Sequence, residues 1–465
     1  MLRNRPSVLL ILVIIVGLVL SPDAEAFGNL PDGFADQQVI ASVPSPTAIA
    51  WLPGGQMLVT GQGGIVYRQQ GNSAVPVLNL TGQICSGGET GLLGLAVDPA
   101  FASGQPYIYV YYTFKKGSCG DAAGRVNRLS RFSLDGSFNT GPEDVLLDNI
   151  SAKGGNHNGG DVQFGKDGLL YISVGDAGSD ILNDNGQNGN GNARRLSLVN
   201  GKILRIAPDG TVPASNPYTG AGTTSCAMTG QAPVLREDGH AEKKKKRKGK
   251  KGNHKKNKKK HKRKQRNRQD RNQQQQPPGQ QQPPPGVNPP TGNESICQEI
   301  YATGLRNPYR IAFDPDGVAG NQRLYINDVG GGAWEEIDEA SAGADYGWNV
   351  REGPCPIGTS GNCAADNRFT EPIFAYPHST GCRTITGGAF VPNNSGWPAQ
   401  FLDAYLYADF ICDQIFALRG EAPGQSPFVF GTGTGATHLA FGPDNALYYT
   451  TFDGGGQVRR IVYQG

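Results

Sequence analysis

The sequence predicts an all-β protein, a six-bladed β-propeller with four-stranded antiparallel blades and one long disordered basic insertion loop. Three observations support this prediction. Glycine accounts for 67 of the 465 residues, well above its usual share of roughly 7%. A hairpin pattern recurs six times along the chain. The copies are unevenly spaced, which favours blades with long loops over a solenoid.

Each copy of the hairpin pattern has an apolar strand, a turn rich in Pro, Asp or Gly, and a second strand that often contains Leu-Tyr or Ile-Tyr. These turn residues supply the backbone conformations that tight turns need. The copies begin at Ala50, Leu95, Val162, Ile311, Gly388 and Leu439. Beyond the N-terminal segment, the one candidate helix is AWEEIDEASAG, from Ala333 to Gly343. A β-sandwich is the alternative architecture.

The first 26 residues are typical of a secretory signal peptide. A basic start precedes an apolar run of 13 residues, Val8 to Leu20, and the AEA at residues 24–26 fits a signal-peptidase site. Cleavage there leaves a single propeller domain over residues 27–465. Because a spanning helix needs about 20 apolar residues, a permanent anchor is the weaker interpretation. We therefore expect a secreted protein, periplasmic or extracellular, with no transmembrane segment in the mature chain.

The eight cysteines are expected to form disulfides, because the compartment of an exported protein is oxidising. Eight cysteines allow 105 connectivities, so the sequence alone does not settle the pairing. A metal site is the alternative, but the chain has no CxxC pair and its histidines do not cluster near the cysteines. Local spacing suggests the pairs Cys85–Cys119, Cys226–Cys297, Cys355–Cys363 and Cys382–Cys412.

One segment, from Glu242 to Asn293, interrupts the β pattern and is rich first in Lys and Arg and then in Gln and Pro. It has almost no apolar residues to bury, so we expect it to be disordered. Outside this insert the chain is acidic, although the whole chain carries a net charge of +3. The insert could contact a polyanion electrostatically, or serve only as a solvated linker. Its lack of aromatic residues argues against sequence-specific binding to nucleic acid.

Three stretches carry candidate active-site residues. In GGNHNGGDVQFGKDGLLYISVGDAG, His157 lies on a glycine-rich loop before a predicted strand and could act as a general base. The alternative is a loop histidine that only binds a neighbouring blade. In YATGLRNPYRIAFDPDG, Pro308 places Arg306 and Asn307 on a loop, where the arginine could bind anionic oxygens or merely loop carbonyls. In INDVGGGAWEEIDEASAGADYGW, glycine carbonyls and nearby acids suit calcium, although such loops are often only solvated.

These stretches, together with ETGLLGLAVDPAF, closely resemble the soluble quinoprotein glucose/sorbosone dehydrogenase family. That family also includes aldose sugar dehydrogenases and the propeller of hedgehog-interacting proteins. The resemblance runs from about Ile40 to Val462 and is interrupted by the basic insert. It implies a six-bladed propeller that holds pyrroloquinoline quinone (PQQ) and calcium at the mouth of its channel. It also implies an oxidoreductase acting on CH-OH groups of an aldose or related sugar, with electrons passing to an external acceptor.

The resemblance also assigns roles to individual residues. His157 would take the proton of the sugar hydroxyl while hydride passes to the quinone, and Arg306 would assist at the quinone oxygens. The cofactor would be contacted by Glu89, Arg306, Asn307 and Arg383. Calcium would bind the backbone carbonyls of Gly330 and Gly331.

The chain departs from the glucose dehydrogenase branch of this family in three places. Asn156 stands where that branch has an acid before the histidine. Thr386 stands where a lysine falls, with Arg383 close by, and Ile411 to Gln414 offers no basic residue. Each missing charge-assisted partner of the cofactor carboxylates is worth roughly 1.5–3 kcal/mol. Two alternatives therefore stay open: a non-catalytic extracellular binding propeller like the hedgehog-interacting proteins, and a calcium-dependent propeller hydrolase such as a lactonase.

Overall fold

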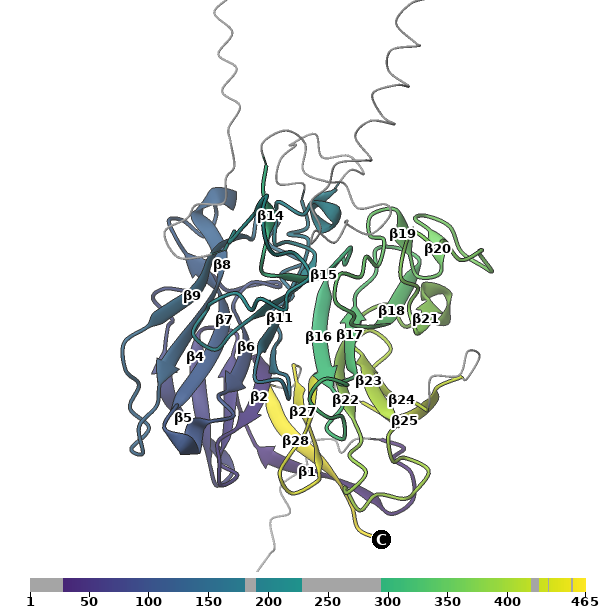
Figure 1. Cartoon of the computed structure of the whole chain (residues 1–465). Coiled ribbons are helices and arrows are strands. Elements are labelled where there is room, and N and C mark those ends of the chain that lie inside the picture. The colour runs from purple at the N-terminus through teal and green to yellow at the C-terminus, as the bar shows by residue number, and fades with distance from the viewer. Residues whose placement is uncertain (1–27, 180–189, 228–293, 420–425, 434, 453–454) are drawn as a thin grey trace, which may run out of the picture.

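The computed structural model describes residues 28–179, 190–227, 294–419, 426–433, 435–452 and 455–465. Within these ranges, six four-stranded antiparallel sheets are arranged as the blades of a propeller (Figure 1), which confirms the predicted fold class. Two short strand pairs and four 3-10 turns complete the secondary structure of the described ranges. The predicted signal peptide and the basic insert, residues 242–293, lie outside the described residues. No helix in the described ranges is long and apolar enough to cross a membrane.

The strands of each blade are given in order from the innermost to the outermost. Blade 1 consists of β2 (Pro46–Trp51), β3 (Met57–Gly61), β4 (Ile65–Gln70) and β5 (Ser73–Asn79). Blade 2 consists of β6 (Leu92–Val97), β7 (Tyr107–Lys115), β8 (Arg125–Ser133) and β9 (Asp144–Ser151). Blade 3 consists of β10 (Val162–Phe164), β11 (Leu170–Val174), β12 (Lys202–Ile206) and β15 (Ile300–Thr303).

The three blades in the second half of the ring also have four strands each. Blade 4 consists of β16 (Pro308–Phe313), β17 (Leu324–Asp328), β18 (Trp334–Glu339) and β21 (Phe374–Pro377). Blade 5 consists of β22 (Ile385–Phe390), β23 (Tyr405–Asp409), β24 (Gln414–Leu418) and β25 (Phe428–Thr432). Blade 6 consists of β26 (Ala436–Phe441), β27 (Leu447–Thr451), β28 (Gln457–Tyr463) and the N-terminal strand β1 (Phe34–Ile40).

The innermost strands surround the central channel. Each of β2, β6, β10, β16, β22 and β26 contacts the next, and β26 contacts β2, so the ring is closed. The six hairpins predicted from the repeated pattern are the two inner strands of the six blades. In blade 3, for example, Val162 pairs with Ile172 across such a hairpin. The apolar residues of each blade pack against the neighbouring blade and form the core.

The one candidate helix is wrong, because Trp334–Glu339 forms strand β18. All but the last residue of this strand are buried, since neighbouring structure covers both of its faces. The usual alternation of apolar and polar residues is therefore missing. Three of its buried residues are acids, Glu335, Glu336 and Asp338, and they give the stretch a misleading helical spacing.

Blade 6 joins the two ends of the folded chain. Strand β1 pairs with β28, with Phe34 opposite Tyr463. Beyond the strands, the N–H of Gln464 donates to the carbonyl of Gly33 at 2.7 Å. The propeller is thus closed by hydrogen bonds between its first and last strands (Figure 1).

All eight cysteines lie in the described ranges and form four disulfides. The pairs are Cys85–Cys119, Cys226–Cys297, Cys355–Cys363 and Cys382–Cys412, as the local spacing suggested. Two further short strand pairs lie outside the blades: β13 (Thr223–Thr224) pairs with β14 (Ile296–Cys297), and β19 (Arg351–Glu352) pairs with β20 (Cys355–Pro356). The Cys226–Cys297 disulfide therefore joins the point where the chain leaves blade 3 to the point where it returns to that blade.

Candidate functional site

A cavity of about 440 Å³ lies where the inner strands begin. This volume falls within the roughly 300–1,000 Å³ of ligand sites. Every predicted catalytic, cofactor-binding and calcium-binding residue lines it: Glu89, His157, Arg306, Asn307, Gly330, Gly331 and Arg383. These residues come from loops of four blades. The ring thus brings together stretches that are far apart in the sequence.

His157 lies on the loop that leads into β10 and has a left-handed backbone, with φ of 51°. Non-glycine residues rarely adopt this conformation, and it persists where the surroundings enforce it. Here the backbone N–H donates to Oε2 of Glu89 at 2.7 Å, and the His157 carbonyl accepts from Ala177. The ring Nδ1 lies 2.7 Å from Oδ1 of Asp176. When Nδ1 carries the proton of that hydrogen bond, Nε2 has a free lone pair.

Asp176 is the site residue that the sequence analysis missed. It follows β11, and its residue is 1% exposed. Its carboxylate also accepts hydrogen bonds from Trp348 Nε1 and from the Gly178 N–H, both at 2.8 Å. The resemblance to the glucose dehydrogenase branch implies an acid directly before the histidine, where this chain has Asn156. The signal that could have found Asp176 is the sequence VGDAG, which places an aspartate at the end of the strand next to the His157 loop.

A hydrogen bond joins Glu89, on the loop before blade 2, to Asn307, on the loop before blade 4. The Asn307 side-chain amide donates to Oε2 of Glu89 at 3.1 Å, and its Oδ1 accepts from the Gly159 N–H at 3.1 Å. The backbone N–H of Asn307 donates to Oδ1 of Asp328 at 2.6 Å. Asn307 therefore fixes the loop of His157 and the position of Glu89, while its side chain borders the cavity.

Arg306 lies on the loop that leads into β16 and lines the same cavity as His157, and its carbonyl accepts from the Asp176 N–H at 2.8 Å. Its Nη1 donates to the Val329 carbonyl at 2.9 Å, and its guanidinium lies 5.5 Å from the ring centre of Trp348. Because Trp348 also binds Asp176, the arginine, the tryptophan and the His157–Asp176 pair form one connected network. The sequence left open whether Arg306 binds anionic oxygens or only loop carbonyls, and its contact with Val329 is of the second kind. The same guanidinium also lines the cavity.

The loop of Gly330 and Gly331 is held by one carboxylate. Oε1 of Glu352 accepts hydrogen bonds from four consecutive backbone N–H groups, of Gly331, Gly332, Ala333 and Trp334, at 2.7–3.1 Å. In a planar trans peptide the carbonyl points opposite to the N–H, so the Gly330 and Gly331 carbonyls point away from Glu352. A Cβ on Gly330 would lie 1.5 Å from the Trp334 carbonyl oxygen, so a larger residue does not fit.

The acids that the sequence placed near this loop lie behind it rather than in the cavity. Asp328, Glu335 and Glu336 are buried, and none of them lines the cavity. Burial raises the pKa of Asp328 to about 7, although its carboxylate accepts the N–H groups of Arg306 and Asn307. These side chains support the loop and are not merely solvated.

The cavity also has an imidazole that the sequence analysis did not assign. His378 lines it, with Nε2 2.7 Å from Oε1 of Glu335, and this hydrogen bond raises the pKa of His378. Arg383 lies exposed at the rim. The Thr386 hydroxyl donates to the Ala436 carbonyl at 2.6 Å, so it takes part in the channel wall. Ile411, in the stretch without basic residues, is exposed and does not line the cavity.

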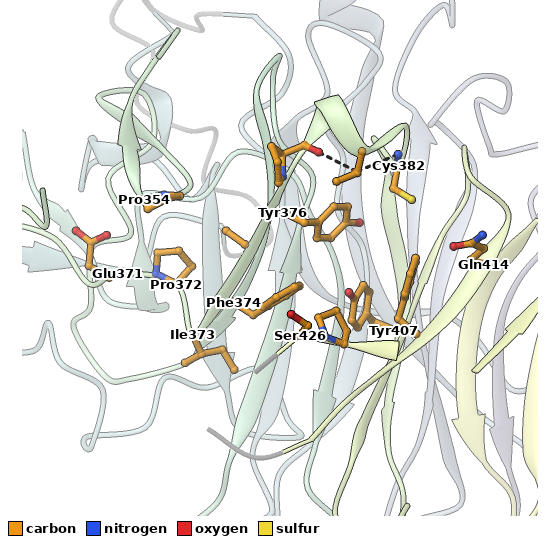
Figure 2. Close-up of a pocket in the computed structure, with 15 residues that line it drawn as sticks. Pro354, Glu371, Pro372, Ile373, Phe374, Tyr376, Cys382, Tyr407, Gln414 and Ser426 are labelled. Atoms are coloured by element: carbon orange, nitrogen blue, oxygen red, sulfur yellow. Dashed lines mark hydrogen bonds between the residues drawn. The ribbon is translucent and has the colours of Figure 1, made fainter. Parts of the chain in front are cut away.

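A second and larger hollow, about 700 Å³, lies between blades 4 and 5 (Figure 2). Figure 2 shows Phe374 and Tyr376 of β21 on one side and Tyr407 of β23 on the other. The rings of Tyr376 and Tyr407 stack, with their centres 5.9 Å apart. None of the predicted catalytic, cofactor-binding or calcium-binding residues lines this hollow, so the channel cavity is the candidate functional site.

Comparison with known proteins identifies the family. Residues 43–228 and 279–460 match the model of the family described as glucose/sorbosone dehydrogenase. The chain belongs to this family.

Two related sequences show different extents of similarity to this member of the glucose/sorbosone dehydrogenase family. Aldose sugar dehydrogenase YliI of Escherichia coli is 22% identical over 433 residues, which is 90% of this chain and 89% of the relative. HIPL2 protein of Arabidopsis thaliana is 37% identical over 148 residues, which is 30% of this chain and 20% of the relative. The match thus spans about a fifth of the length of the plant protein.

The fold is also that of solved structures. The PQQ-bound form of aldose sugar dehydrogenase from Streptomyces coelicolor superposes with a TM-score of 0.61 and 20% identity, covering 93% of this chain and 99% of that chain. At this level of identity, the comparison supports the propeller architecture.

Proposed function

We propose that this chain is an exported sugar dehydrogenase that oxidises an aldose or related sugar with PQQ and calcium, using His157 as the general base. One observation carries the proposal. His157 and Arg306, from the loops of two different blades, line one ligand-sized cavity, and the histidine is oriented by a buried carboxylate. A base with that partner on a shared cavity suits proton removal from a substrate hydroxyl.

The residues around the cavity fit a flat, anionic cofactor. Arg306 and Arg383 supply positive charge, and a hydrogen bond to Glu335 raises the pKa of His378. At Gly88 the space that a side chain would occupy is open, which leaves room for a flat ring close to the backbone. The outward carbonyls of Gly330 and Gly331 suit calcium, which prefers oxygen ligands. PQQ, when bound, supplies the electron acceptor for the oxidation.

The protein's own contribution is to orient the sugar and to accept its proton. Nε2 of His157 takes the proton of the hydroxyl at the carbon being oxidised. The ionised Asp176 keeps Nδ1 protonated and stabilises the imidazolium that forms. Asp176 thereby supplies a carboxylate for the histidine, although Asn156 stands where the glucose dehydrogenase branch has an acid, so that departure does not weigh against the proposal.

The test is reconstitution of the mature protein with PQQ and calcium, followed by reduction of an artificial dye with several aldoses. His157→Ala is expected to reduce the rate by about 10²–10⁴-fold, the usual contribution of a general base. Binding of PQQ, measured separately by titration, should stay near the wild-type level. A wild-type protein that binds no PQQ at micromolar concentration contradicts the proposal.

A non-catalytic extracellular binding propeller is the second candidate. Two observations favour it: Arg306 already binds a loop carbonyl, and the position of Thr386 offers no cation. If PQQ does not bind, the result favours the non-catalytic binding propeller. A calcium-dependent hydrolase has less support, because among the described residues Glu89 is the single carboxylate that lines the cavity, and such a metal needs several oxygen ligands.

The setting of the enzyme is part of the same proposal. Export follows from the N-terminal signal peptide, and electrons pass to an external acceptor. The basic insert, residues 242–293, contacts a polyanion through its charge. These statements rest on the sequence and are tested by localisation of the expressed protein and by salt-dependent binding to heparin.

A further inference from the structure

Arg310 is a buried arginine that forms the inner end of the cavity. It lies on β16 of blade 4, lines the cavity and is 2% exposed. Its Nη2 donates to the Thr47 carbonyl at 2.6 Å. Thr47 belongs to β2 of blade 1, and blades 1 and 4 are opposite each other in a ring of six. The side chain therefore crosses the channel beneath the residues of the proposed active site.

In the described part of the chain, no carboxylate lies within ion-pair distance of the Arg310 guanidinium. Nη1 donates to the Tyr309 carbonyl at 2.9 Å, and the buried Nε has no hydrogen-bond partner among the described residues. Buried arginines are normally paired. Arg459, which is 4% exposed, shows the usual arrangement, with Nη2 2.6 Å from Asp36.

The nearest carboxylate interacts with Arg310 only at a distance. Burial raises the pKa of Asp161 and the charge of Arg310 opposes that rise, but the two Asp161 oxygens accept the backbone N–H groups of Val162 and Ile311, both at 2.9 Å, and none accepts from the guanidinium. Burial, and then the charge of Arg310, hold the pKa of His438 well below its ordinary range. That imidazole is therefore neutral, and it too has an unpartnered nitrogen, Nδ1.

We propose that Arg310 forms a carboxylate subsite at the inner end of the cavity, where a carboxylate of the bound ligand pairs with its guanidinium. The planar fork of arginine matches a carboxylate and makes strong, charge-assisted hydrogen bonds. Two sources carry this chemistry, the cofactor and an acidic sugar such as a uronic acid. The cofactor source rests on the proposed function, whereas the acidic-sugar source does not need PQQ.

The test measures equilibrium binding of three probes: PQQ in the presence of calcium, and glucuronate and glucose without the cofactor. Arg310→Met removes the charge and keeps an unbranched side chain. The affinity for at least one of the two carboxylate probes is expected to fall by about tenfold or more. The affinity for uncharged glucose should not change. Loss for PQQ alone places the carboxylate on the cofactor, and loss for glucuronate alone places it on the sugar.

Two further variants separate binding from a structural role. Arg310→Lys keeps the charge and loses the fork, so it should give a smaller loss of the same probe. It also serves if Arg310→Met does not fold. Arg459→Met, the matched buried arginine outside the cavity, should lower the melting temperature and leave all affinities unchanged.

The outcomes distinguish this proposal from the proposed function. If the wild type binds glucuronate through Arg310 and binds no PQQ, the subsite stands and the dehydrogenase proposal fails. If it binds PQQ and the folded Arg310→Met and Arg310→Lys variants bind both carboxylates within twofold of wild type, the subsite is contradicted and the dehydrogenase proposal stands. A wild type that binds neither carboxylate probe contradicts both.

Discussion

The chemistry available to His157 depends on which group holds its Nδ1. A neutral amide in that position accepts or donates without preference, whereas a buried carboxylate fixes the proton on Nδ1 and leaves Nε2 as the base. Asp176 is itself held by Trp348 and Gly178, so its orientation does not depend on the ligand. The pair is therefore preorganised before any substrate binds.

Asp176→Asn is expected to keep the fold and lose most of the activity. The amide would present an N–H to Nδ1 and so move the ring proton to Nε2, where it blocks proton acceptance. We expect kcat to fall about 10²–10⁴-fold, with PQQ binding unchanged. Steady-state dye reduction and a PQQ titration measure the two quantities.

The matched control is Asp148→Asn, a carboxylate that pairs with Arg128 outside the cavity. Its kcat should equal that of the wild type. An Asp176→Asn variant with wild-type kcat would show that the histidine does not act through this carboxylate.

At the scale of single residues, the sequence could predict those with a motif. Glu89, His157 and Arg306 stand in stretches with a recognisable order, and the structure places all three on one cavity. Asp176 and Arg310 stand in the same stretches, but the sequence analysis gave neither of them a role. An aspartate at a strand end and an arginine on an inner strand acquire their significance only through burial and through partners from other blades.

At the scale of elements, β14 and β15 flank a buried glutamate that makes stability depend on pH. Oε1 of Glu299 accepts the N–H groups of Cys226 and Ala227, while Oε2 has no partner among the described residues. Burial raises the pKa of Glu299 above its ordinary value of 4.5. The folded protein thus retains a proton that the unfolded chain releases.

The sign of the effect follows from that difference. Stability from this group is fully present below pH 4.5 and is lost as pH rises through the folded pKa. Glu299→Gln removes the titration, so its melting temperature should fall less than that of the wild type between pH 4.5 and pH 8. Thermal unfolding followed by circular dichroism across this range checks the difference.

Glu294→Gln is the control for this pH series, because Glu294 is an exposed glutamate in the same segment. Its melting curve should follow that of the wild type at every pH. Parallel profiles for Glu299→Gln and wild type would mean that Glu299 ionises in the folded state as readily as in the unfolded chain.

Elements were predictable where the turn chemistry was local. The Pro, Asp and Gly turns between inner strands identified all six hairpins. The prediction failed for AWEEIDEASAG because a middle strand buried on both faces loses its alternating pattern. Glu335 and Glu336, two of the buried acids in β18, accept hydrogen bonds from His378 and Gly353, which a local window of sequence does not include.

At the scale of the whole molecule, ring closure depends on β1. Phe34 packs edge-on against Trp397, Phe401 and Phe430, with ring centres 4.7–5.3 Å apart. It thus joins the closing strand to the core of blades 5 and 6. The sequence could predict the number of blades from the repeats. It could not predict that the N-terminal strand completes the last blade, because that strand lacks the repeated turn.

Phe34→Ala is expected to destabilise the protein by about 2–3 kcal/mol, below the roughly 3–5 kcal/mol of a fully buried phenylalanine, because Phe34 is only half-buried. Denaturant unfolding measures the change. Val318→Ala, at a 63% exposed position, should stay within about 0.5 kcal/mol of the wild type. A Phe34→Ala variant as stable as the control would contradict the role of β1 in closure.

The disulfide between Cys226 and Cys297 has a consequence for the evolution of blade 3. The bond and the short β13–β14 pair join the chain at the base of residues 228–293, so the blade does not rely on the intervening peptide for its continuity. A protease that cuts within those residues leaves one covalent molecule. Insertions, deletions and changes of charge can accumulate there under selection of their own, while the cavity of the ring stays the same.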